Sequence, residues 1–195
     1  MRLTCNINGT QYSLVVNSDK PLSQILRENI ITFAENSQCL GASCGNCIVL
    51  INGSAALSCL VPAFKLNGAS ILTFEGFQKT RFCHDIERAF ADVGNQPCPQ
   101  CYPSKTVIIE SILNKLDKEN QSRLTGFNES SASQSEGSAA NEHAARSRSG
   151  SGAISTEMIA KEMAMSSCQC MEISDVEKII NLAYKYRSRR RARRS

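Results

Sequence analysis

The sequence predicts an α+β protein with two domains, a small β-rich domain followed by an all-α domain. Apolar residues recur with a period of two up to about residue 76 and with a period of 3.6 beyond it. The chain has 195 residues, a length that fits two compact domains, and it has no Trp, so we expect cores built from Leu, Ile, Val and Ala. We therefore expect a β-rich domain over residues 1–76 and a helical domain over residues 77–187.

Turn signals divide the first domain into short strands. Asn8-Gly9 separates two β-rich runs within residues 2–16, and Asn52-Gly53 separates two more. Asn-Gly supplies the positive φ angles of a tight hairpin turn. A short helix beginning near Pro21 and a further β-rich run from Ser70 complete the domain.

Four apolar stripes with helical spacing follow and predict a bundle of four helices. They lie near residues 82–93, 107–116, 156–165 and 175–186. Between the second and third stripes, residues 122–153 are rich in Ser, Ala, Gly, Asn and Glu, so we expect a flexible insert.

The formal net charge of +4 is concentrated at the C-terminus, because residues 185–195 carry one Lys and six Arg. We expect residues 188–195 to form a disordered basic tail, and we expect no nucleic-acid partner, because the rest of the chain is weakly acidic. No signal peptide and no long apolar segment are visible, which predicts a cytoplasmic protein without a membrane span. In that compartment thiols stay reduced, so the ten cysteines favour metal ligation over disulfides.

Four cysteines of the first domain have the plant-type ferredoxin spacing. The pattern is C-x4-C-x2-C, followed after eleven residues by a fourth cysteine, and it predicts a [2Fe-2S] cluster. A zinc site is the alternative, although zinc ribbons usually show two C-x2-C pairs. The four candidate ligands are Cys39, Cys44, Cys47 and Cys59.

The helical domain carries a second set, Cys98 and Cys101 at C-x2-C with Cys168 and Cys170 at C-x-C. Each pair is expected at a helix terminus, facing the other pair across the bundle. The spacing alone leaves zinc, a redox dithiol and an iron-sulfur cluster open.

The order of these motifs resembles the small iron-sulfur subunit of the molybdenum hydroxylases, the family of xanthine dehydrogenase, aldehyde oxidoreductase and aerobic carbon monoxide dehydrogenase. The resemblance covers most of the chain except the insert and the tail. It rests on the segments Cys39 to Cys47, Ser58-Cys59-Leu60, Thr73 to Gly76, Arg88 to Gly94, Cys98 to Pro103, and Cys168-Gln169-Cys170.

This resemblance implies a plant-ferredoxin-like β-grasp domain with one [2Fe-2S] cluster and a four-helix-bundle domain with a second. It also implies two partners, a large subunit that binds molybdopterin and a medium subunit that binds FAD. The chain would then relay electrons from molybdenum to flavin and contain no catalytic site itself. The alternatives are a stand-alone ferredoxin-like carrier and a structural zinc-binding module, and the substrate is not encoded in this chain.

Several positions depart from the family pattern. Pro97 and Pro99 stand where the family has Gln and Gly, and Gln169 replaces an Arg. Leu40 and Ala42 occupy positions where Gly is usual, and the segment from Cys101 to Cys168 is about twice the usual length. Because a Gln side chain and a backbone contact are lost, the changes at the two prolines put the contact with the molybdenum cofactor in question.

Overall fold

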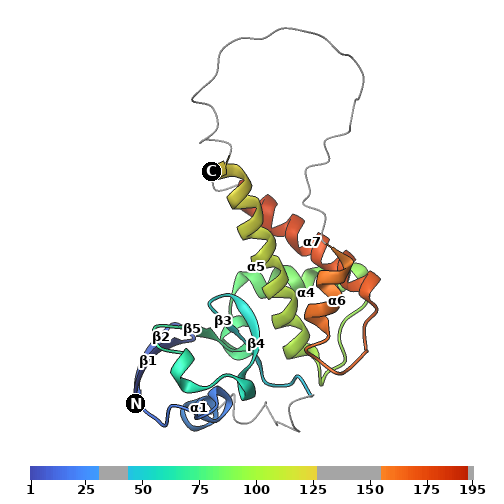
Figure 1. The fold of residues 1–195 in the computed structure, drawn as a ribbon. Coiled ribbons are helices and arrows are strands. Elements are labelled where there is room, and N and C mark those ends of the chain that lie inside the picture. The colour runs from blue at the N-terminus through green and yellow to red at the C-terminus, as the bar shows by residue number, and fades with distance from the viewer. Residues whose placement is uncertain (31–43, 127–154, 193–195) are drawn as a thin grey trace, which may run out of the picture.

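The computed structural model describes residues 1–30, 44–126 and 155–192. Within this part of the chain, a five-stranded sheet is followed by a helical domain, as Figure 1 shows. The predicted α+β fold class, with a β-rich domain before a helical one, is confirmed. None of the described helices has an apolar stretch that could cross a membrane.

The sheet is built from two hairpins joined through a central strand. Strands β1 (Arg2–Ile7) and β2 (Thr10–Val15) form the first hairpin, and β3 (Ile48–Ile51) and β4 (Ser54–Leu57) form the second. The strand order is β2-β1-β5-β3-β4, and β5 (Ser70–Leu72) pairs in parallel with β1 and antiparallel with β3. This mixed sheet, with α1 (Leu22–Asn29) packed on one face, has the β-grasp arrangement.

Strand β3 is buried on both faces, which explains why its sequence is entirely apolar. Val49 belongs to the core that includes Leu22 and Leu26 of α1, whereas Ile48 and Leu50 belong to the core of the helical domain. Adjacent residues of a strand point to opposite faces, so one strand joins the two cores. The β-rich and helical domains are therefore held in a fixed relationship.

The helical domain consists of α4 (Arg81–Val93), α5 (Tyr102–Gly126), α6 (Thr156–Met163) and α7 (Ile173–Ala192), preceded by the short α3 (Phe74–Phe77). Thr80 accepts a hydrogen bond from the Cys83 amide at the start of α4, and Gly94 ends that helix with φ 73°. Helix α5 lies against the second hairpin, where the Ala55 amide donates to Ser111 Oγ at 2.8 Å. The four helices predicted from the apolar stripes are confirmed.

Two boundaries differ from the sequence-based expectation. Residues 122–126 continue α5 instead of opening the flexible insert, and the remainder of the predicted insert lies outside the described residues. The prediction of a disordered tail from residue 188 is wrong for residues 188–192, which continue α7.

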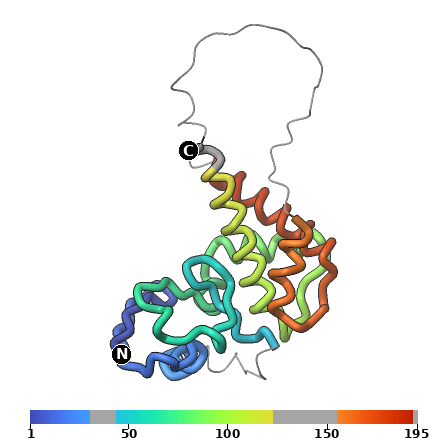
Figure 2. Tube along the Cα trace, viewed as in Figure 1, coloured from blue at the N-terminus to red at the C-terminus, as the bar shows by residue number. Residues whose placement is uncertain are grey.

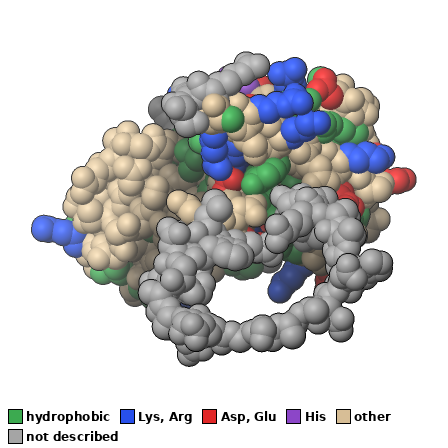
Figure 3. Space-filling view, turned by 90° about the horizontal axis from the view of Figure 1, so that it is seen from above, with side chains coloured by type: hydrophobic (Ala, Val, Ile, Leu, Met, Phe, Trp, Pro, Cys, Tyr) green, Lys and Arg blue, Asp and Glu red, His purple; other side chains and the backbone are tan. Residues whose placement is uncertain are grey.

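The physical reason for the ordered tail is a set of acids on neighbouring helices. Arg190 forms an ion pair with Asp85 of α4, and Arg191 forms one with Asp117 of α5. These acids are 74 or more residues away in sequence, so the local pattern of the tail gave no sign of them. Figure 3, which views the molecule from the top of Figure 1, shows several Lys and Arg side chains on this face.

Candidate metal centres

The structure brings together the four cysteines of the second predicted set. Their sulfur atoms all lie within 4.8 Å of one another, and Cys98 Sγ is 3.9 Å from Cys168 Sγ. Cys101 is buried, and the other three cysteines are partly buried. The pairs are 70 residues apart in the chain, so their convergence is a property of the fold.

Both pairs lie in connections between helices, as expected from the sequence. Cys98 and Cys101 form a turn before α5, in which the amides of Cys101 and Tyr102 both donate to the Cys98 carbonyl at 2.9 Å. Cys168 and Cys170 lie between α6 and α7. Figure 2 shows this orange connection beside the start of α5.

Hydrogen bonding and burial make three of these thiols unequal in acidity. The backbone N–H of Cys101, followed by the neighbouring thiols, lowers the pKa of Cys98 to about 7. Burial raises the pKa of Cys101 to about 12 and also raises that of Cys170. Of these three thiols, Cys98 therefore loses its proton at the lowest pH, and a bound metal cation would favour deprotonation of the others.

The donor set fits a metal centre with four thiolate ligands. A tetrahedral ion with metal-sulfur bonds of about 2.3 Å holds its sulfurs roughly 3.8 Å apart. Both zinc and iron-sulfur centres use four thiolates. The spacing here matches a single tetrahedral ion, whereas a [2Fe-2S] cluster, whose two irons bind two thiolates each, requires sulfurs on opposite irons to lie farther apart than 4.8 Å.

The described members of the first set lie at one end of the second hairpin. Cys47 directly precedes β3, and Cys59 lies in the 3-10 turn Ser58–Leu60 that follows β4. Because Ile48 pairs with Leu57, the chain segments that carry these cysteines leave the hairpin side by side. Cys44 precedes them and is partly buried. Cys39, like Leu40 and Ala42, lies outside the described residues.

Ser58 joins the two strands at this end. It is fully buried, and its amide and its hydroxyl both donate to the Cys47 carbonyl, at 3.2 and 2.7 Å. These bonds fix the separation of the chain segments that carry Cys47 and Cys59. In the sequence, Ser58 belongs to one of the motifs that carry the family resemblance, and its spacing predicts no role for it.

The two cysteine sets adjoin through Gly45. This residue, between Cys44 and Cys47, has φ +74°, and a Cβ added to it would lie 2.6 Å from both Met165 O and Ser166 Cα. Ser166 precedes Cys168 by two residues and is buried. The loop of the first set is therefore packed directly on the segment that leads into the second.

The substituted positions lie beside the second set. Pro97 is buried, whereas Pro99 and Gln169 are exposed. Pro97 and Pro99 line a surface depression of about 430 Å³ together with Gln96, Tyr102 and Pro103. The side chains present there are mostly apolar.

The two remaining cysteines are not part of either set. Cys5 is buried in β1, and Cys83 is buried in α4, where its thiol contacts Glu87 at 3.7 Å. Burial is the main cause that raises the pKa of Cys83 to about 12. Both behave as small core residues.

Comparison with known sequences found no matching family model, but it found relatives among characterised proteins. The xanthine dehydrogenase iron-sulfur-binding subunit of Escherichia coli is 34% identical over 113 residues, which cover 58% of this chain and 70% of that protein. The nicotinate dehydrogenase small FeS subunit of Eubacterium barkeri is 26% identical over 113 residues, covering 58% and 72%. An aldehyde oxidoreductase iron-sulfur-binding subunit of Escherichia coli is 30% identical over 125 residues, covering 64% and 55%.

Solved structures show the same fold. Quinoline 2-oxidoreductase from Pseudomonas putida matches with a TM-score of 0.60 at 23% identity, over 97% of this chain and 96% of that one. The aldehyde oxidoreductase from Desulfovibrio gigas matches with a TM-score of 0.63 at 18% identity, over 97% of this chain and 17% of that one. The likeness therefore extends over both domains.

Proposed function

Because the chain belongs to the iron-sulfur small subunits of the xanthine dehydrogenase and aldehyde oxidoreductase family of molybdenum hydroxylases, we propose that it relays electrons through two [2Fe-2S] clusters. Each cluster, when bound, supplies a one-electron donor and acceptor. The first would be held by Cys39, Cys44, Cys47 and Cys59, and the second by Cys98, Cys101, Cys168 and Cys170.

The observation that carries the proposal is the convergence of the second set. Four thiols from two connections between helices lie within 4.8 Å of one another, although the two pairs are 70 residues apart in the sequence. Four unligated thiols so close would repel one another on ionisation, so a metal is the simplest reason to place them there. Family membership then favours iron and sulfide over zinc.

The contact at Gly45 supports transfer between two centres. The loop with Cys44 and Cys47 packs directly on the segment that leads to Cys168. A short separation between centres is what an electron relay requires. The rigid join through β3 would hold that separation constant.

We further propose that the chain works between two partners, with a molybdopterin-binding large subunit on one side and an FAD-binding medium subunit on the other. The relatives are named as subunits of oxidoreductases, which supports assembly with other chains. By its family resemblance, the second centre would lie on the molybdenum side and the first on the flavin side. The hydroxylation reaction would then take place on another chain.

Single cysteine variants of the anaerobically purified protein test the ligand assignment. Cys47→Ser should remove one [2Fe-2S] signal from the EPR spectrum of the dithionite-reduced protein, and Cys168→Ser should remove the other. Cys83→Ala and Cys5→Ala are the controls, because both residues are buried cysteines outside the sets, and both signals should survive. Loss of both signals in a control, or of neither in a ligand variant, would contradict the assignment.

Co-purification with partner subunits distinguishes an electron-relay subunit from a stand-alone ferredoxin-like carrier. A tag on this chain should co-purify polypeptides that contain molybdopterin and FAD from the native host. A fully loaded chain that elutes alone and exchanges electrons with a soluble reductase would support the carrier instead.

A further inference from the structure

Lys105 is a buried cation beside the second cysteine set. Its exposed fraction is only 2%, although Lys is rarely buried without a partner. It follows Cys101 by one helical turn, and its amide donates to the Cys101 carbonyl at 2.9 Å. Long side chains on a helix lean back toward its N-terminus, which here is the turn that contains Cys98 and Cys101.

The Lys105 side chain lines a pocket of about 590 Å³ together with Cys168, Gln169 and Ser166. It therefore contributes to the same hollow as one of the candidate ligands.

No carboxylate in the described part of the chain forms an ion pair with Lys105. Glu172 lines the same pocket but is not paired with it. A cation whose side chain has so little access to water is stabilised by negative charge nearby. The cysteines, once they are thiolates, supply negative charge at the same end of α5, and Cys168 lines the same pocket as Lys105.

We propose that Lys105 supplies a fixed positive charge that raises the reduction potential of the centre held by Cys98, Cys101, Cys168 and Cys170. The inference rests on the proposed function, because only a redox centre has a potential to raise. A [2Fe-2S] centre with four thiolates is already anionic, and its reduction adds one electron and one negative charge. The cation attracts the reduced state more strongly than the oxidised state, and limited access to water strengthens this effect.

The charge of Lys105 would favour electron transfer in one direction. A higher potential at the second centre makes it a better acceptor from the molybdenum side. Lys105 would thereby favour the first step of the relay without touching a substrate.

A redox titration of the loaded chain, followed by EPR, tests this role. Lys105→Met removes the charge and keeps the length of the side chain, and Lys105→Arg keeps the charge. Lys118→Met is the matched control, since Lys118 lies on the same helix and is exposed. At a fixed solution potential, the ratio of reduced to oxidised second centre should fall about tenfold or more in Lys105→Met.

The Arg variant and Lys118→Met should stay near the wild type, and the first centre should be affected far less than the second. The EPR titration reads only loaded centres, so lower iron content in one variant does not prevent the comparison. Lys105→Gln is a second neutral variant for which the same fall is expected. An unchanged potential in both neutral variants of an iron-loaded protein would overturn the role of Lys105, whereas wild type without iron would overturn the proposed function instead.

Discussion

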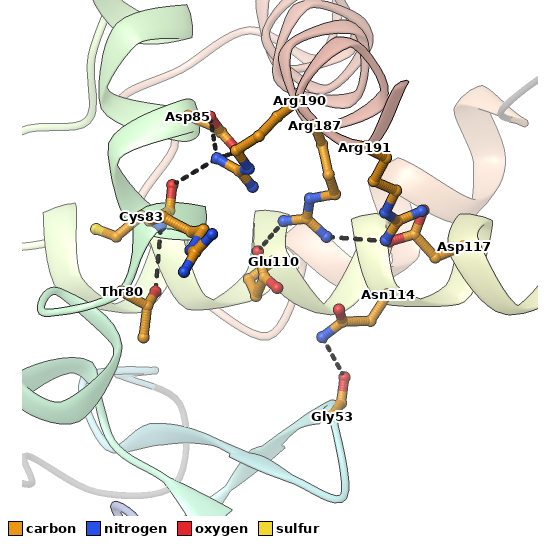
Figure 4. Close-up of polar contacts among 11 residues, drawn as sticks. Gly53, Thr80, Cys83, Asp85, Glu110, Asn114, Asp117, Arg187, Arg190 and Arg191 are labelled. Carbon is orange, nitrogen blue, oxygen red and sulfur yellow. Dashed lines mark hydrogen bonds and ion pairs between the residues drawn. The ribbon is translucent and has the colours of Figure 1, made fainter. Parts of the chain in front are cut away.

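Arg187 and Glu110 form a buried ion pair between α7 and α5. Arg187 Nη2 lies 2.5 Å from Glu110 Oε2, and the two side chains are 1% and 5% exposed. Figure 4 shows Arg187 between Glu110 and Asp117 of the same helix. The guanidinium also lies 4.6 Å from the centre of the Phe82 ring on α4, so this α7 side chain contacts two other helices.

Replacing Arg187 by Met should strongly destabilise the helical domain. The change leaves Glu110 buried without its counter-charge, which typically costs about 3–5 kcal/mol. Chemical denaturation followed by circular dichroism measures the loss. Arg189→Met is the control on the same helix, because Arg189 is exposed, and its effect should stay within about 0.5 kcal/mol. Equal losses of stability in the two variants would show that the buried ion pair contributes no more to stability than an exposed Arg.

Glu110 should make stability depend on pH. Burial, opposed by Arg187, raises its pKa from the ordinary value of 4.5 to about 7. Between these pH values the folded state keeps a proton that the unfolded chain has released, so the free energy of unfolding falls as pH rises through this window. Glu110 lowers the free energy of unfolding by roughly 1–3 kcal/mol across this window, and its effect changes little at higher pH.

The measurement compares the wild type with Glu110→Gln at pH 5 and pH 7.5. The difference between the two proteins isolates this group from other titrating side chains. The wild type should lose more stability than the variant over this range. Parallel pH profiles would contradict the assignment.

Substitution at Gly45 should disturb the contact between the two cysteine sets. In Gly45→Ala the new Cβ meets backbone atoms of Met165 and Ser166 at 2.6 Å, so the segments must separate. Gly68→Ala is the matched control, because Gly68 has nearly the same φ, +72°, and open space around it. Both variants bear the cost of a left-handed Ala, about 1–2 kcal/mol. Gly45→Ala should lose roughly 1–3 kcal/mol more and show weaker magnetic coupling between the centres.

Ser58→Ala should affect the first centre selectively. It removes the hydroxyl that donates to the Cys47 carbonyl at 2.7 Å and should cost about 1–2 kcal/mol. We expect a lower occupancy of the first centre and an unchanged second centre, measured by quantitative EPR. Ser70→Ala, at an exposed site on β5, should leave both unchanged. A loss confined to the second centre would show that Ser58 does not support the first.

Local sequence signals predicted the elements that local chemistry determines. Both Asn-Gly pairs form the expected turns, with φ 53° at Asn8 and 52° at Asn52. The apolar stripes marked the four helices, and the C-x2-C and C-x-C pairs do come together. In each case the signal and the structure involve neighbouring residues or a recognisable ligand spacing.

Long-range charge pairing was not predictable in the same way. The basic run at the C-terminus indicated a solvated tail, because Asp85, Glu110 and Asp117 lie far away in sequence and only the packing of α4 and α5 against α7 brings them near. The sequence did not indicate that Lys105 is buried either, since a single Lys in a helix is normally exposed. Nor did the sequence indicate that Gly45, between Cys44 and Cys47, packs on Ser166 of the helical domain.

The most direct test of the central claim is iron and acid-labile sulfide analysis of the anaerobically purified wild-type chain. Two [2Fe-2S] clusters on eight cysteines require about four irons and four sulfides per chain, with two distinguishable EPR signals after reduction. Zinc in place of iron, with no sulfide and no EPR signal, would contradict the electron-relay account.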